Sequence, residues 1–195
     1  WQSQKMTAKT RLFLCPFRAE AKLLTSVLPD CRSIDSNHWK FKSGEIFTWN
    51  GAGSEKLQSA LQGFAGLHNF DRIVLFGAAG ALAPNLEIGD IFSVSTAIYD
   101  SRRVEIAPAT GFLAAETVTV DAPVLAAADR QALFSQTGAV MADMESFFLI
   151  SGLPKLAAKL EVIRFISDTA AVPFSLPFSD KIKKSVCNMR KLFIA

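Results

Sequence analysis

Cysteine and histidine are scarce in this chain, and the few that occur are scattered. The 195 residues include three cysteines and two histidines, with no CxxC pair and no histidine at metal-ligand spacing from a cysteine. An odd, scattered set of thiols excludes a disulfide framework and a zinc site, and it is typical of reduced thiols in a cytoplasmic protein. No spacing implies a metal or an organic cofactor. The residues concerned are Cys15, Cys31, Cys187, His38 and His68.

Long apolar runs are also missing. No stretch approaches the roughly 20 apolar residues that a membrane-spanning helix needs, and the start WQSQKMTAKT lacks the apolar segment of a signal peptide. We therefore expect a cytoplasmic protein with no membrane partner. From its length we expect an N-terminal extension over residues 1–9 and one domain over residues 10–195.

The chain has no large excess of one charge and no basic tract. Its 21 lysines and arginines and 18 aspartates and glutamates give a net charge of +3 and are spread along the sequence. Nucleic-acid binding needs a concentrated basic surface. The charge pattern therefore argues against a nucleic-acid partner and favours a small-molecule ligand.

Two glycine-rich phosphate-binding motifs are absent. The run GAAGA at 77–81 does not match GxGxxG, and the sequence contains no GxxxxGK[ST]. Rossmann-type dinucleotide binding and P-loop nucleotide binding therefore lack support. By itself the run predicts a tight turn of small residues, which would also let a ligand approach the backbone closely.

What the sequence does contain is an alternation of short apolar runs with longer amphipathic segments. The runs have strand length and predict strands at 11–15, 72–77, 91–96, 117–120, 139–142 and 161–167. Helical patterns occupy 18–28, 54–68, 124–136, 144–151 and 179–193. The alternation predicts an α/β domain of three layers, with a mixed, mostly parallel central sheet flanked by helices. Irregular surface loops are expected at 100–116 and 170–180.

Carboxylates follow three of the predicted strands. Glu20 falls in the first turn of the helix after the first strand, Glu145 follows the fifth strand and Asp168 the sixth. Each alone has an ordinary explanation, because acids stabilise helix N-termini and aspartates serve as N-caps. Ligands of such sheets, however, bind at the carboxyl ends of the strands. Together the acids suit cleavage of an N-ribosyl bond, which needs a proton for the leaving base and a nucleophile aimed at the anomeric carbon.

Three segments match the motifs of a known family in order. They are VLFGAAGALAPNLEIGDIFSVSTAI at 74–98, ADMES at 142–146 and VIRFISDTA at 162–170. With them the chain resembles the purine nucleoside phosphorylase and nucleosidase family, and most of all its hydrolytic branch, the 5′-methylthioadenosine/S-adenosylhomocysteine nucleosidases. The resemblance implies a nucleoside phosphorylase-like fold. It also implies hydrolysis of a purine-type nucleoside, methylthioadenosine-like or futalosine-like, to free base and sugar.

The resemblance gives each acid a role. Asp168 matches the general acid that protonates the purine at N7, and Glu20 falls where the nucleosidases have the acid that activates water. Glu145 matches the acid that binds the ribose hydroxyls, and Met144 the residue that packs on the sugar. Arg164 matches an arginine near the catalytic acid. We also expect other acids near Asp168. The remaining substrate contacts that the resemblance implies are Gly77, Ala78, Ala79, Gly80, Asp121 and Val124.

Water is favoured over phosphate as the nucleophile. The phosphorylases of the family have a serine in the glycine turn and an arginine just before it, where this chain has Ala78 and Leu75. A carboxylate at Glu20 would also repel phosphate, which proteins hold with arginines, hydroxyls or backbone amides. Arg18, two residues away, keeps a phosphate-dependent phosphorylase open as an alternative. A non-catalytic nucleoside-binding relative is another.

The chain departs from the nucleosidases around the base. Its segment between Tyr99 and Asp121 is much shorter than theirs, and Pro123 stands where they have an aromatic residue. Futalosine hydrolase and the hopanoid-associated nucleoside phosphorylase are similarly compact, so the nucleoside is left open. Members of the family form dimers, trimers or hexamers, and we expect a homo-oligomer here.

Overall fold

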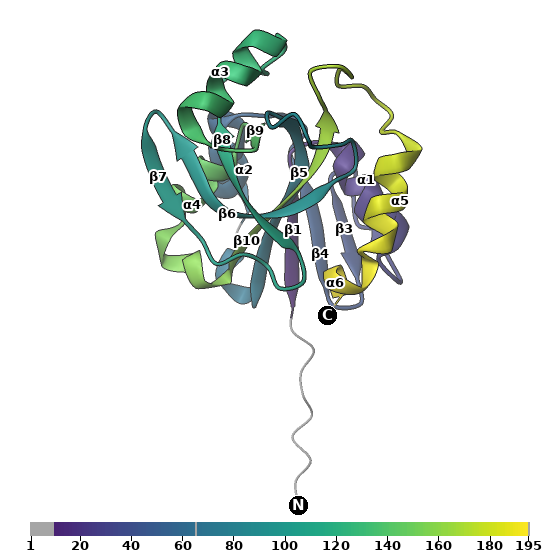
Figure 1. Cartoon of the computed structure of the whole chain (residues 1–195). Helices are drawn as coiled ribbons and strands as arrows, with labels where there is room; N and C mark the ends of the chain where they lie inside the picture. The colour runs from purple at the N-terminus through teal and green to yellow at the C-terminus, as the bar shows by residue number, and fades with distance from the viewer. Residues whose placement is uncertain (1–9, 65, 195) are drawn as a thin grey trace, which may run out of the picture.

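The structure is a computed structural model that describes residues 10–64 and 66–194 (Figure 1). Within these ranges ten strands form one sheet. They are β1 (Arg11–Cys15), β2 (Arg32–Ser33), β3 (His38–Phe41), β4 (Gly44–Thr48), β5 (Arg72–Ala81), β6 (Ile91–Tyr99), β7 (Arg102–Glu105), β8 (Leu113–Thr119), β9 (Met141–Asp143) and β10 (Leu160–Asp168). The helices are α1 (Arg18–Val27), α2 (Ser54–Gly63), α3 (Ala127–Thr137), α4 (Ser146–Gly152), α5 (Asp180–Asn188) and α6 (Arg190–Ile194), with the short 3-10 helices η1 (Leu67–Asn69) and η2 (Pro154–Lys159). The extension expected at residues 1–9 lies outside the described residues.

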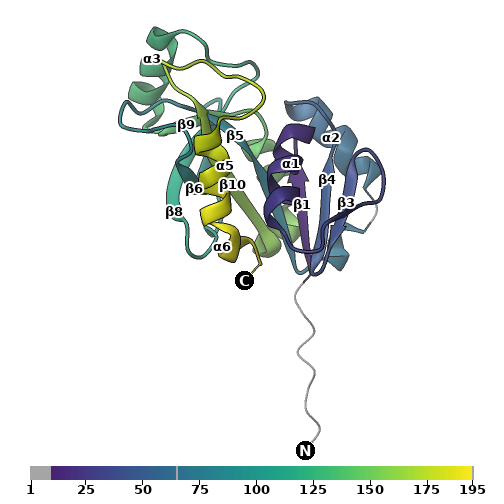
Figure 2. The same cartoon turned by 90° about the vertical axis from the view of Figure 1, so that its right-hand side faces the viewer.

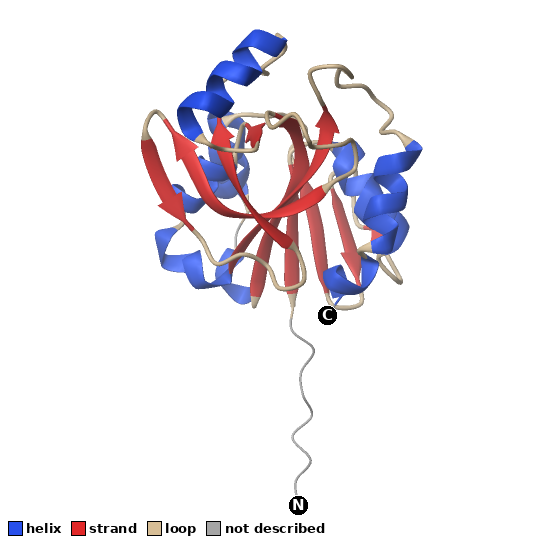
Figure 3. Cartoon of the chain, in the orientation of Figure 1, coloured by secondary structure: helices blue, strands red, loops and turns tan. Residues whose placement is uncertain are grey.

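Parallel pairs form the centre of the sheet. Strands β4, β1, β5 and β10 lie side by side in the same direction. Antiparallel neighbours flank them, with β3 beside β4 and β6 beside β10. Because β5 pairs with both β10 and β9, the order β10–β6–β8–β9–β5 closes on itself into a circuit of strands (Figure 3). The mixed α/β sheet predicted from the sequence is confirmed.

Helices cover both faces of the sheet because its strands are apolar on both faces. Successive side chains of β1 point to opposite faces. Phe13 joins the apolar cluster that contains Leu24 of α1 and Phe193 of α6, whereas Leu12 joins the cluster of Leu57 of α2. Figure 2 shows α1, α5 and α6 in front of the sheet. Burial of each such side chain contributes about 1.5–3 kcal/mol to the free energy of folding. None of the helices in the described ranges has the length and apolarity needed to cross a membrane.

The GAAGA run is not a turn. Residues 77–81 continue β5 to its end, paired with β10 along one edge, and Gly80 and Ala81 also pair with β9. The predicted turn is therefore wrong, because backbone pairing on both edges keeps the small residues extended. Their small size still matters, since it leaves the backbone of β5 accessible beside the cavity described below.

Other boundaries also differ from the sequence prediction. The segment 100–116, expected to be irregular, contains β7, paired with β6, and the start of β8. Strands β2, β3 and β4 were not predicted, because exposed or half-buried polar residues interrupt their apolar positions. The helix expected at 54–68 ends at Gly63, and the helix expected at 144–151 begins at Ser146. The helix expected at 179–193 is divided into α5 and α6.

Candidate active site

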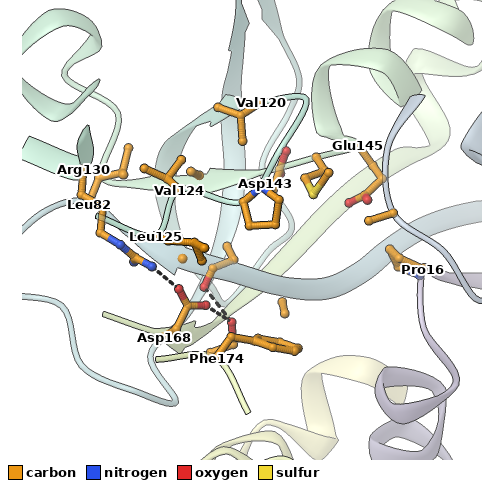
Figure 4. A pocket seen from close by; sticks show the side chains of 18 of the residues that line it. Pro16, Leu82, Val120, Val124, Leu125, Arg130, Asp143, Glu145, Asp168 and Phe174 are labelled. Atoms are coloured by element: carbon orange, nitrogen blue, oxygen red, sulfur yellow. Dashed lines mark hydrogen bonds and ion pairs between the residues drawn. The ribbon is translucent and has the colours of Figure 1, made fainter. Parts of the chain in front are cut away.

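A cavity lies where the parallel strands β1, β5 and β10 end (Figure 4). Its volume is about 410 Å³, within the range of small-molecule sites. Its walls come from the segments after β1 and β8, the ends of β5, β9 and β10, helix α3 and the loop after β10. Ligand sites of such sheets lie at the carboxyl ends of strands. The place to which the sequence pointed is therefore where the structure has its cavity.

Glu20 reaches the cavity from the first turn of α1. Its Oε2 accepts a hydrogen bond from the backbone N–H of Phe17 (2.7 Å), and its Oε1 accepts one from the N–H of Ala78 on β5 (2.8 Å). The residue is only 2% exposed. Burial outweighs the two hydrogen bonds and, helped by the charge of Glu145, raises the pKa of Glu20 to about 8. Glu20 therefore changes its protonation state near neutral pH, as suits a general base.

Glu145 is the N-cap residue of α4 and joins two other parts of the chain. Its Oε1 accepts a hydrogen bond from the N–H of Gly53 (3.0 Å), and its Oε2 accepts one from Nη2 of Arg164 (3.0 Å). Burial raises the pKa of Glu145, although the positive charge of Arg164 opposes the shift. The carboxyl group is thus fixed at the cavity wall by donors on two sides.

Arg164 lies behind the cavity rather than in its lining. It is fully buried in β10, where Nε donates to Oδ2 of Asp143 (3.0 Å) and Nη2 to Glu145, while Nη1 has no partner in the described part of the chain. Gly77 is its register partner on β5. Four residues of β10 separate Arg164 from Asp168, a span of about 13 Å, so Arg164 contacts the acids near Glu20 and not Asp168.

Gly77 is required by this packing. A Cβ atom at residue 77 would lie 2.7 Å from Nη1 of Arg164 and 2.8 Å from Oε1 of Glu20. Both groups are held by other hydrogen bonds, so neither can move aside cheaply. Gly77 does not itself line the cavity, but it lets the two charged groups approach the backbone of β5.

Asp168, at the end of β10, carries an ion pair that the sequence did not predict. Its Oδ2 accepts a hydrogen bond from Nη2 of Arg130 (2.5 Å), and its Oδ1 accepts one from the hydroxyl of Ser167 (2.6 Å). Nη1 of Arg130 also donates to the carbonyl of Ala81 (2.9 Å). The ion-pair partner of Asp168 is thus a guanidinium (Figure 4).

Sequence reasoning missed Arg130 because its helix looks exposed. Arg130 is the buried residue of α3, whose other positions are exposed or half-buried. A buried arginine needs an acidic partner, but no spacing in the sequence connects residue 130 with Asp168. The pairing follows from how α3 returns over the end of β10, which only the fold shows.

The other predicted contacts divide into two groups. Five of them line the cavity as expected: Ala78, Ala79, Gly80, Val124 and Met144. Asp121 is not among them: it is exposed and accepts a hydrogen bond from the hydroxyl of Tyr99 (3.1 Å). Pro123, noted as a departure near the base, is part of the lining.

Glu20 and Asp168 stand at two ends of one short stretch of β5. Gly77 lies beside Glu20, and a Cβ at Gly80 would lie 3.0 Å from Oδ2 of Asp168. Three residues of a strand span about 10 Å. The spacing therefore suits a ligand of two joined rings with one acid at each end.

Acids dominate the charged part of the lining. Among the described residues that line the cavity, four are acidic and one is basic, and most of the others are apolar or small. The acids are Glu20, Asp143, Glu145 and Asp168, and the base is Arg130. Within the described ranges no group of three or more His, Cys, Asp or Glu side chains is placed to hold a metal ion. Because Arg130 pairs with Asp168 and Arg164 pairs with Asp143 and Glu145, these charges are largely compensated, and the cavity suits an uncharged ligand.

Comparison with known proteins identifies the fold. No protein-family model and no curated protein sequence matches the chain, but solved structures do. The 5′-methylthioadenosine/S-adenosylhomocysteine nucleosidase of Campylobacter jejuni is 16% identical over 95% of this chain and 97% of that one, with a TM-score of 0.72. A variant of the Helicobacter pylori enzyme with 5′-methylthioadenosine in its active site is 15% identical over 96% and 97%, with a TM-score of 0.70. A variant of the Chlamydia trachomatis nucleosidase bound to the same compound is 17% identical over 94% and 93%, with a TM-score of 0.70.

Proposed function

We propose that this protein, whose fold is that of the 5′-methylthioadenosine/S-adenosylhomocysteine nucleosidases, hydrolyses the N-ribosyl bond of a purine-type nucleoside to free base and sugar. The observation that carries the proposal is the convergence of Glu20, Glu145 and Asp168 on one cavity from three distant parts of the chain. Burying an acid costs free energy unless the acid is hydrogen-bonded or paired, so proteins seldom gather several of them at one cavity. Such gathered acids are typical of active sites.

Asp168 serves the leaving base. As the bond between the anomeric carbon and the base breaks, negative charge collects on the purine ring. For this step Asp168 carries a proton; the carboxyl proton moves to ring nitrogen N7 as the bond breaks and so neutralises that charge, and the carboxylate regains a proton from solvent after the base leaves. Its position is fixed by Ser167 on one oxygen and by Arg130 on the other, so its carboxyl group stays aimed at one place.

Glu20 serves the incoming water. Its carboxylate takes one proton from the water molecule while the remaining hydroxide adds to the anomeric carbon, so the products are the sugar and the protonated base. Glu145 accepts hydrogen bonds from the ribose hydroxyls, and Met144 packs against the sugar. This order places water and base on opposite sides of the ribose, in keeping with the spacing of about 10 Å along β5.

The charge of the cavity favours hydrolysis over phosphorolysis. A phosphorylase must hold a phosphate dianion with free basic groups or amides. Arg130, the one basic side chain in the described lining, is already paired with Asp168, and the end near Glu20 also contains Glu145. Acids at that end would disfavour a phosphate dianion, whereas an uncharged water molecule can approach Glu20.

We further propose that the protein acts in the cytoplasm as a homo-oligomer. The thiols of Cys15, Cys31 and Cys187 are all unpaired, as is usual in a reducing compartment. Large apolar side chains, Leu125 and Phe174, are exposed while they also line the cavity, and a second copy would cover them. Light scattering on the purified protein measures the assembly, and a monomer at micromolar concentration would contradict it.

The proposed reaction is tested with a panel of purine nucleosides, incubated with and without phosphate and separated by chromatography. The expected products are free base and free ribose, at a rate that phosphate does not change. Phosphate-dependent release of ribose 1-phosphate would identify a phosphorylase instead. Nucleoside binding in calorimetry without release of base would identify a non-catalytic relative.

A further inference from the structure

One end of the cavity holds an arginine and an aspartate from distant parts of the chain. Arg130 comes from α3 and Asp168 from the end of β10, and both line the cavity (Figure 4). Arg130 is 4% exposed. The hydrolysis described above needs Asp168 near the base but gives Arg130 only a positioning contact. Its place beside the base leaves a second use open.

The guanidinium of Arg130 has donors to spare. An arginine carries five N–H donors. Nη2 donates to Asp168 and Nη1 to the carbonyl of Ala81, while Nε is buried and has no partner in the described ranges. A buried donor without a partner is unfavourable. Because Nε is buried, the donors that a bound base can meet are the second N–H groups of Nη1 and Nη2, beyond those bonded to Ala81 and Asp168.

Asp168, by contrast, has few acceptor sites left. Its Oδ1 takes the hydroxyl of Ser167 and its Oδ2 takes Arg130. On the edge that carries N7, a 6-aminopurine presents one acceptor and one N–H donor, whereas a 6-oxopurine presents two acceptors, N7 and O6. An amino group beside Arg130 would bring two donors face to face. A carbonyl oxygen there forms the pairing that arginine makes with such purine edges.

We propose that Arg130 is a specificity-determining residue that selects nucleosides of 6-oxopurines, of the hypoxanthine or guanine type, against those of adenine. The assignment rests on the proposed function, in which Asp168 faces the base. Gly80 supports it, because a Cβ there would lie 3.0 Å from Oδ2 of Asp168 and 3.2 Å from Nη1 of Arg130. Bare backbone beside the pair lets a flat ring approach both groups.

The test uses two matched pairs of compounds. Inosine and adenosine share one sugar and are compared by kcat/KM, and the free bases hypoxanthine and adenine are compared by their Kd in calorimetry. We expect the wild-type protein to prefer inosine and hypoxanthine by about 10- to 100-fold, the range for a hydrogen bond to a charged donor. Arg130→Met should lose both preferences. Arg103→Met, which removes an exposed arginine paired with Glu116, should keep them.

Each outcome decides the assignment separately from the reaction. Turnover with a preference for adenosine and adenine, or with none, would overturn the role of Arg130 and leave the nucleosidase standing. If the protein binds hypoxanthine in preference to adenine but turns over no nucleoside, and Arg130→Met loses that preference, the role of Arg130 is supported and hydrolysis is refuted. Absence of binding to either base would overturn both. If Arg130→Met does not fold, Arg130→Lys keeps the charge without the planar donors, and an unchanged preference in that variant would overturn the role.

Discussion

Gly77 and Arg164 are register partners across β5 and β10, and the guanidinium of Arg164 and the carboxyl of Glu20 both approach the position that a Cβ atom at residue 77 would occupy. The closeness has a structural cause. Arg164 is held by Asp143 and Glu145 on one side, so its free Nη1 has room only toward β5. Glu20, Glu145 and Arg164 therefore pack as one unit against β5 at Gly77.

Gly77→Ala should disturb this unit. The added Cβ would lie within 2.8 Å of a charged atom on each side, and overpacking of this kind costs about 1–3 kcal/mol. Unfolding in urea measures the loss of stability, and we expect kcat/KM to fall at least about tenfold, since a small misplacement of catalytic groups is costly. Gly63→Ala is the control, because a Cβ at Gly63 meets nothing within 4 Å. An active, stable Gly77→Ala would mean that the packing described for Glu20 is not needed.

Glu20→Gln should lower kcat by about 10²- to 10⁴-fold, the usual contribution of a general base. Because the pKa of Glu20 is about 8, kcat/KM of the wild-type protein should rise with pH as the carboxyl loses its proton and level off above that value. Glu55→Gln changes an exposed acid in the first turn of α2 and should leave the rate unaltered. A flat profile from pH 6 to 9 would exclude Glu20 as the base.

The same residue links stability to pH. The pKa of Glu20 is raised from 4.5 to about 8 in the folded protein, so between these values the folded state binds a proton that the unfolded state has lost. Stability from this group is present below pH 4.5 and is lost as the pH rises through 8. Glu20→Gln, which cannot ionise, should gain stability relative to wild type between pH 5 and pH 9, at about 1.4 kcal/mol per unit of pKa shift. Thermal unfolding of both proteins at pH 5 and at pH 9 measures the gain. If there is none, folding does not raise the pKa of Glu20.

Asp168→Asn should lose both turnover and stability. Turnover falls by orders of magnitude because an asparagine has no carboxyl proton to give to N7 of the leaving base. Stability falls by about 3–5 kcal/mol because the buried guanidinium of Arg130 is left without its counter-charge. Adding Arg130→Met should recover part of the stability but none of the turnover. Asp180→Asn removes an exposed aspartate paired with Lys183 and should change neither.

Glu145→Gln should act mainly on binding. The amide still fills the N-cap position of α4 but accepts hydrogen bonds from the ribose, Gly53 and Arg164 less well. We expect KM to rise about tenfold or more and kcat to fall less than in Glu20→Gln. Glu116→Gln, at an exposed ion pair, is the matched control. A variant with unchanged KM would place the ribose away from Glu145.

The sequence supplies the sheet and the acids because both obey local rules. The strands around Phe13 and Phe165 could be predicted because apolar residues dominate their runs. Glu20, Glu145 and Asp168 could be found because a carboxylate directly after a buried strand has a known meaning. Strands β2, β3 and β4 were not predicted, since polar residues break their pattern.

Arg130 and the GAAGA strand show what local reading misses. Arg130 sits in a mostly exposed helix, and its ion-pair partner is an acid 38 positions away. The GAAGA run has the composition of a turn, yet β9 and β10 pair with it and hold it extended. Both features are decided by contacts between distant parts of the chain, which a sequence pattern does not contain.

The closed circuit of strands has a dynamic consequence. Since β5 is bonded to β1, β9 and β10 together, opening any one of these pairings leaves it fastened by the others. Its amide protons should exchange with solvent only when the whole sheet unravels, whereas those of β2, attached through β3 alone, should exchange by local fraying. The part of β5 that lines the cavity, Ala78 to Gly80, should therefore be a rigid floor.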